Sequence, residues 1–454
     1  MDKTKNKKHF RIRPMIIVLL GFLAVMLAGA FLLSLPISNT NGKWLNFPDA
    51  AFWAMNGVCG TGLVVTSTAL SFTGFGQAIL LLLIQFGGLG FMTIATLVFI
   101  IIRKKITLKD RVAIQEALGQ DEIKGIVRLV RNIIIMTLVI EVVGAALLTP
   151  FFCIPNGAIG VWQALFNSVS AFCNAGFDVM GTPENPYASL IDYNHSYGIL
   201  LIICVIAILG AFGFPVINDI LKSKFHWKRY RFHTKVVLIM TASLMTFGAL
   251  FFLTSEFNSA AYAGLNGGEK LLNSIFQSVT ASSTAGFSAV DQTALSQTGK
   301  VFSCVLMFIG ASPCSTGGGI KTTTFAVLLL MGIAGLRGKE EISVGMHSIS
   351  IKNGLKAVAV VMLALILILC GACIISATMS DVPIGDIFFD TISAFTTAGL
   401  SMGTMNNNAM SVTGLFVLDI VMFIGRLGPL SLGLMIANQN KSGLKFPTSN
   451  IMIG

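Results

Sequence analysis

The chain has 454 residues, of which 54% are hydrophobic and only 11% are charged. Soluble domains carry roughly 25% charged residues, so this chain has too little charge to cover a water-soluble body of its size. The composition excludes a disordered chain, a disulfide-framed secreted domain and an ordinary cytosolic enzyme, and it predicts a polytopic membrane protein.

Eight apolar runs are long enough to span a bilayer, which takes about 20 residues. We therefore expect an all-α fold, since helices satisfy their own backbone hydrogen bonds in lipid. The first run, residues 14–35, follows a basic tail as a secretory signal does, but it is longer than a typical signal core. The runs begin near Pro14, Gly76, Val127, Tyr197, Val236, Phe302, Leu355 and Val412.

Lys and Arg cluster in alternate gaps between these runs, whereas Asp and Glu favour the other gaps. The basic gaps are the tail 1–13, the segments 103–131, 222–235 and 337–356, and the residues after 438. The positive-inside rule makes this side cytoplasmic, so we expect a plasma-membrane protein with both termini in the cytoplasm. The net charge of +11 then reflects topology and does not indicate a nucleic-acid partner.

Four segments share one pattern around a glycine. Each has Phe ten residues before the glycine, Cys, Ser or Thr three residues before it, and Leu or Phe directly after it. The glycines are between 110 and 114 residues apart, and the segments are Phe52–Leu63, Phe166–Phe177, Phe276–Phe287 and Phe389–Leu400. Chance would rarely produce four such matches at one spacing, so we interpret the chain as four repeats.

Each repeat has the same order of elements. A long apolar span leads outward, a short amphipathic segment follows, and a second span returns after the glycine. Segments such as Phe47–Val58 and Asp386–Thr397 are too short to cross the membrane, so we predict re-entrant helices there. This M1–P–M2 order predicts a cytoplasmic tail at 1–13 and repeats at 14–105, 106–235 with its preceding loop, 236–338, and 339–454 with the C-terminus.

The glycine stretches suit an ion pathway. Irregular backbone at membrane depth survives only where protein buries it or it lines water, and carbonyls from four matched segments could ring one axis as cation ligands. Close helix packing by small residues explains many of the 46 glycines, but it explains poorly why four are in register. The predicted filter residues are Val58, Cys59, Gly60, Thr61, Gly62, Cys173, Asn174, Ala175, Gly176, Ser283, Thr284, Ala285, Gly286, Thr396, Thr397, Ala398 and Gly399.

The second span of the third repeat is interrupted. Its proline and its glycine triplet disfavour a continuous helix, so we expect a compact mid-membrane loop over residues 310–321 that could block ion flow and still yield. The stretch resembles a phosphate-binding loop, but Ile320 separates glycine from lysine and the motif fails. The predicted gate residues are Gly310, Pro313, Ser315, Thr316, Gly317, Gly318, Gly319, Lys321 and Arg426.

Arg426 lies inside the last apolar run. A cation there costs about 2.5–3.5 kcal/mol even on lenient scales, so it normally faces a cavity or a partner. Two interpretations stay open: a pore-facing charge near the gate, or a structural ion pair with Asp419 or Asp219. We interpret the glycines of segments 86–90 and 209–213 as helix-packing or bending points.

The sequence contains no pattern of catalytic residues, and we predict that the chain is not an enzyme. Cys370 and Cys373 form a C-x-x-C pair, but the pair lies mid-span without a redox domain, so packing is expected. The five histidines show no metal-ligand spacing, and no organic cofactor is expected.

These motifs make the chain similar, over nearly its whole length, to the Ktr/Trk/HKT superfamily of potassium transporters. It most resembles the membrane subunit of the bacterial KtrB type, because no additional helix pair precedes the first repeat. The resemblance implies a pseudo-fourfold pore, an intramembrane gating loop and an arginine beneath the filter. In plant relatives, serine at the first filter position goes with sodium permeation, so glycine at all four positions here implies a preference for K+.

The resemblance also implies a homodimer and a cytosolic RCK-type nucleotide-binding ring of the KtrA type. The inner loops 103–125 and 337–353 are candidate docking surfaces, although attraction to lipid headgroups would explain their lysines equally well. K+ is the expected cargo, and Na+ coupling or conduction stays open. The alternative from another functional class is a membrane receptor or scaffold that transports no ion. Such a protein would not need four glycines in register.

Overall fold

The computed structural model describes residues 14–90, 126–339, 342–344, 347–379, 381–406 and 409–428. The predicted tail 1–13, the inner loop 103–125 and the residues after 428 lie outside this part of the chain. The regular elements of the described residues are helices, except for a hairpin in which β1 (Ile342–Val344) pairs antiparallel with β2 (His347–Ile349). The helical elements agree with the predicted all-α fold, and this hairpin, with three residues in each strand, is a local addition that the prediction did not include.

Four helical groups follow one another along the chain. Each contains a long apolar helix, a short helix and a second apolar helix, and the first, second and third groups add one further helix each among the described residues. The helices are α1 (Pro14–Ser34), α2 (Phe47–Cys59), α3 (Thr68–Ser71), α4 (Gly74–Leu89), α7 (Ile126–Asn156), α8 (Ile159–Phe172), α9 (Tyr197–Ala211), α10 (Phe214–Lys222), α11 (Phe232–Ser255), α12 (Gly267–Ser283), α13 (Gln297–Ile309), α14 (Thr322–Leu336), α15 (Ile351–Thr378), α16 (Ile384–Thr396) and α17 (Val412–Leu427).

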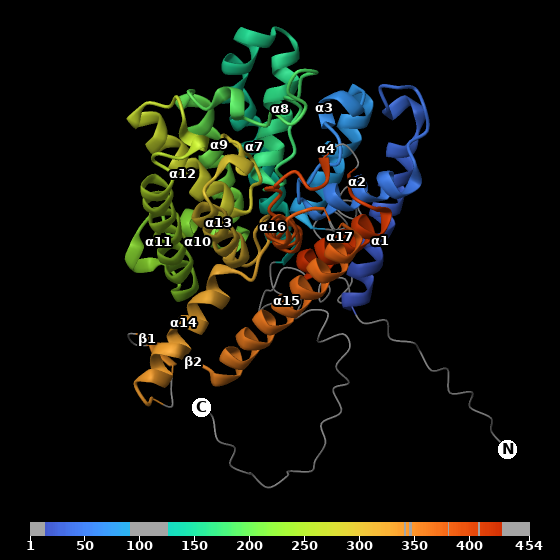
Figure 1. Ribbon diagram of the computed structural model, residues 1–454. Helices are drawn as coiled ribbons and strands as arrows, with labels where there is room; N and C mark the ends of the chain where they lie inside the picture. The colour runs from blue at the N-terminus through green and yellow to red at the C-terminus, as the bar shows by residue number, and fades with distance from the viewer. Residues whose placement is uncertain are drawn as a thin grey trace, which may run out of the picture.

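The groups pack against one another in a closed cycle. The second apolar helix of each group contacts the short helix of the next, as α4 contacts α8, α9 contacts α12 and α13 contacts α16. The cycle closes because α17 of the last group contacts α2 of the first. Helices α14 and α15 project together from one side of this body, with the hairpin at their far ends (Figure 1).

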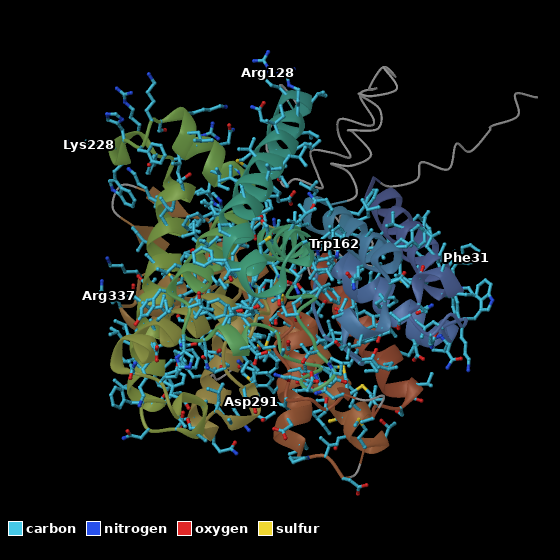
Figure 2. All side chains as sticks on the ribbon, turned by 90° about the horizontal axis from the view of Figure 1, so that it is seen from above. Phe31, Arg128, Trp162, Lys228, Asp291 and Arg337 are labelled. Carbon is cyan, nitrogen blue, oxygen red and sulfur yellow. The ribbon has the colours of Figure 1, made fainter. Side chains whose placement is uncertain are left out.

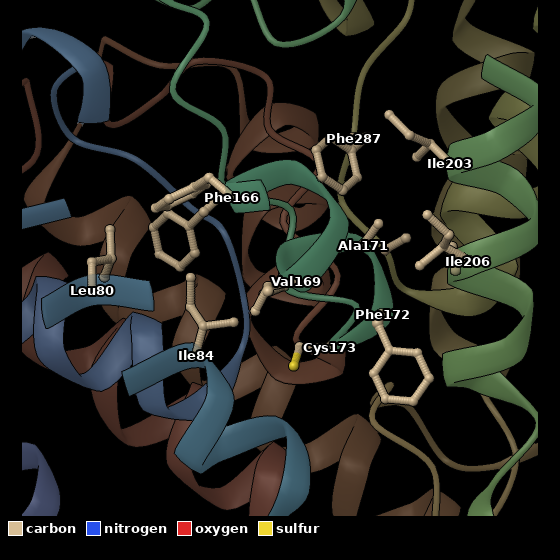
Figure 3. Close-up of a cluster of buried hydrophobic side chains, with 14 of the residues drawn as sticks. Leu80, Ile84, Phe166, Val169, Ala171, Phe172, Cys173, Ile203, Ile206 and Phe287 are labelled. Atoms are coloured by element: carbon tan, nitrogen blue, oxygen red, sulfur yellow. The ribbon is translucent and has the colours of Figure 1, made fainter. Parts of the chain in front are cut away.

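The short helices form the centre of the hydrophobic core. In Figure 3, Phe166 and Val169 of α8 face Ile84 of α4, while Phe172 on the opposite side lies toward Ile206 of α9. All five side chains are buried. The apolar helices around the core leave large side chains exposed, which is the pattern of a surface covered by lipid.

Three described helices are long and apolar enough to cross a membrane, namely Val130–Asn156, Phe232–Ser255 and Ile351–Thr378. The pair α9 and α10 also passes this test, but its two parts bend by 96°. The apolar run that begins near Tyr197 therefore forms two helices with a sharp bend between them, at the segment 209–213 where a packing or bending point was expected. Hydropathy does not detect such a bend, because the apolar run continues through it.

Single glycines interrupt the second apolar helix of every group. Gly90, Gly213, Gly310 and Gly428 have φ angles of 79°, 82°, 63° and 82° and lie directly at helix ends. A left-handed φ is open to glycine but costly for other residues, so each glycine lets the chain leave the helix axis. The interpretation of the glycines of segment 209–213 as packing or bending points is confirmed at Gly213, whereas the residues that follow Gly90 lie outside the described part of the chain.

Other glycines bring the second helices close to the short ones. A Cβ atom added to Gly87 would lie 2.7 Å from the carbonyl carbon of Val58, and one added to Gly425 would lie 2.8 Å from that of Phe395. Gly210 faces the carbonyl oxygen of Phe172 in the same way. The absence of a side chain at these positions therefore sets the distance between the helices.

We predict that Gly87→Val destabilises the protein, because its side chain would overlap a backbone that cannot withdraw. Overpacking of this kind costs about 1–3 kcal/mol, so thermal unfolding of the purified protein in detergent should begin at a clearly lower temperature. Gly332→Val is the matched control, since nothing lies within 4 Å of a Cβ at that helical position. Equal melting temperatures for the two variants would contradict the packing role.

Candidate functional site

All four short helices end with the same turn. The residue two positions before each predicted filter glycine is left-handed, with φ of 63° at Gly60, 49° at Asn174, 57° at Thr284 and 49° at Thr397. The next residue donates its N–H to a carbonyl five positions back, which completes a Schellman motif. These bonds are Thr61 to Asn56 at 3.0 Å, and Ala175 to Ser170, Ala285 to Thr280 and Ala398 to Ser393 at 2.9 Å each.

The four predicted filter glycines meet in a ring. Their φ angles lie between 68° and 87°. A Cβ atom on Gly62 would lie 3.0 Å from Gly176 Cα, one on Gly176 would lie 2.8 Å from Gly286 Cα, and one on Gly286 would lie 3.3 Å from Gly399 Cα. Gly399 closes the ring, because its Cβ would lie 3.3 Å from Gly62 Cα. Neither the conformation nor the spacing leaves room for a side chain.

Backbone oxygens line this ring. The carbonyl oxygen of the residue before each glycine lies beside the glycine of a neighbouring segment, and these residues are Thr61, Ala175, Ala285 and Ala398. The C-terminal ends of four helices point to the same place, which adds the negative end of each helix dipole. Uncharged oxygens in such an arrangement can replace the hydration shell of a cation.

A small polar cavity opens directly against the ring. Its volume is about 140 Å³, and all four glycines line it together with the carboxylates of Asp178 and Asp291. Since the cavity is bordered by every filter segment at once, it connects the ring to the surface formed by the linkers that follow the glycines.

Hydrogen bonds from buried polar side chains hold the backbone of two of the four segments in place. Asn56 donates to the carbonyl oxygen of Leu63 and accepts from the N–H of Gly62 at 2.8 Å. In the third segment, the hydroxyl of Thr280 donates to the carbonyl oxygen of Phe287 at 2.9 Å. Ser170 and Ser393 occupy the same position in the other two segments, but their buried hydroxyls have no partner among the described residues.

The side chains predicted to line the filter have different partners. The hydroxyl of Thr284 and the amide of Asn174 bind the loop described next, whereas the hydroxyl of Thr396 turns back to Ile392 of its own helix. The hydroxyls of Thr61 and Thr397 are buried without a described partner. The lining oxygens of the ring are therefore mainly backbone oxygens.

The loop between α13 and α14 lies directly beneath the helix ends. The hydroxyl of Thr316 is hydrogen-bonded to the Asn174 amide at 2.9 Å and donates to the carbonyl oxygen of Phe172 at 2.8 Å. The N–H of Gly318 donates to Thr284 Oγ1 at 2.8 Å. A Cβ at Gly318 would lie 2.8 Å from the carbonyl carbon of Thr396, so the loop contacts the second, third and fourth filter segments.

Two cations hold this loop through its carbonyl oxygens. Arg426 donates from one nitrogen to the carbonyl of Thr316 and from another to that of Gly87 in α4. Lys321 Nζ donates to the carbonyl of Gly317 at 2.7 Å. Arg426 thus links the loop to the first group as well.

The alternative ion pairs of Arg426 are not present among the described residues. Asp219 lies 4.0 Å from the Arg231 guanidinium and accepts from the Thr234 hydroxyl at 2.7 Å. Asp419 has an oxygen without a described partner. The interpretation of Arg426 as half of a pair with either carboxylate is therefore wrong.

The tethers formed by Asn56 and Thr280 were not among the predicted site residues. The sequence does contain a pattern that could have indicated them, because the residue six positions before each predicted filter glycine is polar and in most cases has apolar neighbours. In chain order these residues are Asn56, Ser170, Thr280 and Ser393.

We predict that Thr280→Val lowers the stability of the protein by about 1–3 kcal/mol, because it leaves the buried Phe287 carbonyl without its donor. Ser170→Ala is the matched control, since the hydroxyl it removes has no described partner, and it should be nearly neutral. Thermal unfolding in detergent measures both. A loss in the control as large as in Thr280→Val would contradict the tether.

Comparison with known proteins places the chain in a family. Residues 14–445 match the family TrkH, described as cation transport protein. The chain is 37% identical to the Ktr system potassium uptake protein B of Bacillus subtilis and 35% identical to the potassium/sodium uptake protein NtpJ of Enterococcus hirae, with 100% of both chains covered in each case. The crystal structure of the potassium transporter TrkH from Vibrio parahaemolyticus has the same fold, with a TM-score of 0.73 at 20% identity over 95% of this chain and 86% of that one. The protein is a member of the TrkH family of cation transport proteins.

Proposed function

We propose that the protein takes up K+ across the plasma membrane through one pore per chain, with the ring of four glycines as its selectivity filter. The closed ring is the observation that carries this proposal, because it gathers four backbone oxygens where four helix C-termini converge. Several relatives are named potassium uptake proteins. The membrane potential would drive the uptake, since it supplies about 2.3 kcal/mol per charge per 100 mV.

Sodium is the second candidate ion, and one specific observation favours it. A relative that matches the whole chain is named a potassium/sodium uptake protein. Rubidium uptake measured with and without external sodium separates the two ions. Uptake that does not depend on sodium supports a simple K+ pathway, and uptake that requires sodium supports coupling.

The loop 310–321 is proposed as the gate of this pathway. It lies against the filter segments on the side opposite the cavity of about 140 Å³, and Thr316, Lys321 and Arg426 hold it in place. All of these contacts are hydrogen bonds to neutral groups, which can be exchanged for bonds to water when the loop moves. The structure described here would be the closed state.

Regulation is proposed to come from a cytosolic partner. Two relatives are B components named after a Ktr system, and a nucleotide-binding ring of the KtrA type would press on the basic inner face of a homodimer. In this arrangement both termini lie in the cytoplasm. The β1–β2 hairpin, between α14 and α15, would belong to the docking surface.

Gly286→Ser tests the filter. The added side chain would meet the Ala398 carbonyl at a residue with φ of 78°, so the preference for K+ over Na+ should fall about tenfold or more, equivalent to about 1.4 kcal/mol. Gly338→Ser is the matched control, because φ is 63° there but nothing lies within 4 Å. Growth of a potassium-uptake-deficient cell at low K+ should be lost only with Gly286→Ser, and unchanged growth would count against the filter.

Thr316→Val tests the gate. It removes the hydrogen bonds to Asn174 and the Phe172 carbonyl, so rubidium flux into liposomes without a regulatory partner should rise several-fold. Shortening the loop within residues 310–321 should raise it further. Ser315→Ala is the control, since that hydroxyl donates only within the loop. If normally expressed Thr316→Val and shortened-loop variants both leak no more than the control, the loop is not the gate.

A further inference from the structure

The outward face of α7 forms a recess with α9 and α10. Two cavities of about 510 and 360 Å³ adjoin there and share Val139, Ile140 and Leu209 in their walls. Every other side chain that lines them is apolar or glycine, apart from the two amides of Asn132 and Asn218. The recess therefore forms an elongated apolar channel on a surface that faces lipid.

The recess continues to a basic mouth at the cytoplasmic end of α7. Its lining residues Asn132, Met136 and Val143 recur at helical spacing, and one turn before Asn132 stands Arg128. Figure 2 shows Arg128 at the end of α7. On the opposite wall, Lys222 ends α10 directly after the lining residue Leu221. Arg128 and Lys222 are both exposed.

The two amides lie between the apolar channel and this mouth. Neither Asn132 nor Asn218 has a side-chain hydrogen bond to a described residue. Polar groups at the edge of the hydrocarbon region need partners, and the ester carbonyls of a glycerolipid are acceptors at that depth. Amide donors next to exposed cations match the ester and phosphate groups of one lipid molecule.

We propose that this recess is a binding site for an anionic phospholipid of the inner leaflet. One acyl chain lies in the channel beside Val139, the ester groups meet the amides, and the phosphate lies between Arg128 and Lys222. A second protein copy fits less well, because the mouth of the recess carries exposed cations without a described carboxylate partner. An acyl chain gains little by leaving bulk lipid for an apolar groove, so the groove positions the lipid and the cations select its charge.

Native mass spectrometry of the full chain in detergent tests the site, with phosphatidylglycerol and phosphatidylcholine of equal chain length as probes. Each basic residue near the membrane surface contributes roughly fivefold to the affinity for an anionic lipid. The double variant Arg128→Gln, Lys222→Gln should therefore bind phosphatidylglycerol about 25-fold more weakly. The double variant Lys228→Gln, Arg337→Gln is the charge control, and Figure 2 shows both of these residues away from Arg128.

A second pair of variants tests the channel itself. Val139→Phe fills the junction of the two cavities and should also lower phosphatidylglycerol retention. Leu138→Phe is its control, because Leu138 is 53% exposed and Val139 55% exposed, but Leu138 lines neither cavity. The melting temperature of each variant checks that it is folded.

Three results would overturn the proposal. They are equal retention of the two lipids by the unaltered chain, equal losses in the charge variant and its control, and cross-linking of a cysteine at Met136 to a second copy. Rubidium flux is measured separately, so a failure of lipid binding leaves the proposed transport function untouched, and loss of transport leaves the lipid measurement valid.

Discussion

The structure depends on one constraint, which is that four stretches of backbone must approach one another closely inside a membrane. Each approach places a carbonyl oxygen beside the glycine of a neighbouring segment, at distances that exclude any Cβ atom. Backbone that is not helical is costly in lipid unless protein buries it. The four short helices and the ring of second apolar helices supply that burial, and the Schellman turns aim the chain at the common centre. The proposed K+ pathway rests on this arrangement.

The loop between α13 and α14 in the third group also depends on the close approach of backbone segments. The loop contacts the second, third and fourth predicted filter segments, and Arg426 links it to the carbonyl of Gly87 in α4 of the first group. The two cations that hold it bind carbonyl oxygens and form no ion pair with a described carboxylate. A partly buried cation that is bonded to carbonyl oxygens keeps its charge, and in the proposed pathway this charge would repel an arriving K+, whereas a neutralised ion pair would not.

Sequence reasoning anticipated that the segments around Gly62, Gly176, Gly286 and Gly399 are equivalent, because their pattern repeats in register, and the structure gives all four glycines a left-handed φ and close mutual contacts. The glycines of segment 209–213 indicated a packing or bending point but not the angle of 96° after Ala211, since one residue with an unusual φ hardly changes the average hydropathy of a run. The hairpin at Ile342–Ile349 was also missed, because strands of three residues give little periodic signal. The partners of Arg426 lie 110 and 339 positions away in the chain, and composition cannot identify contacts that only the closed cycle of helices creates.

The uneven fastening of the ring has a mechanical consequence. Asn56 and Thr280 anchor the first and third segments, which lie across the ring from each other, while Ser170 and Ser393 leave the second and fourth without that support. The ring is therefore stiffer along the line that joins the first and third segments than along the line that joins the second and fourth. If the ring is the filter that we propose, an ion of the wrong size would distort it along the less supported direction and would not expand it uniformly.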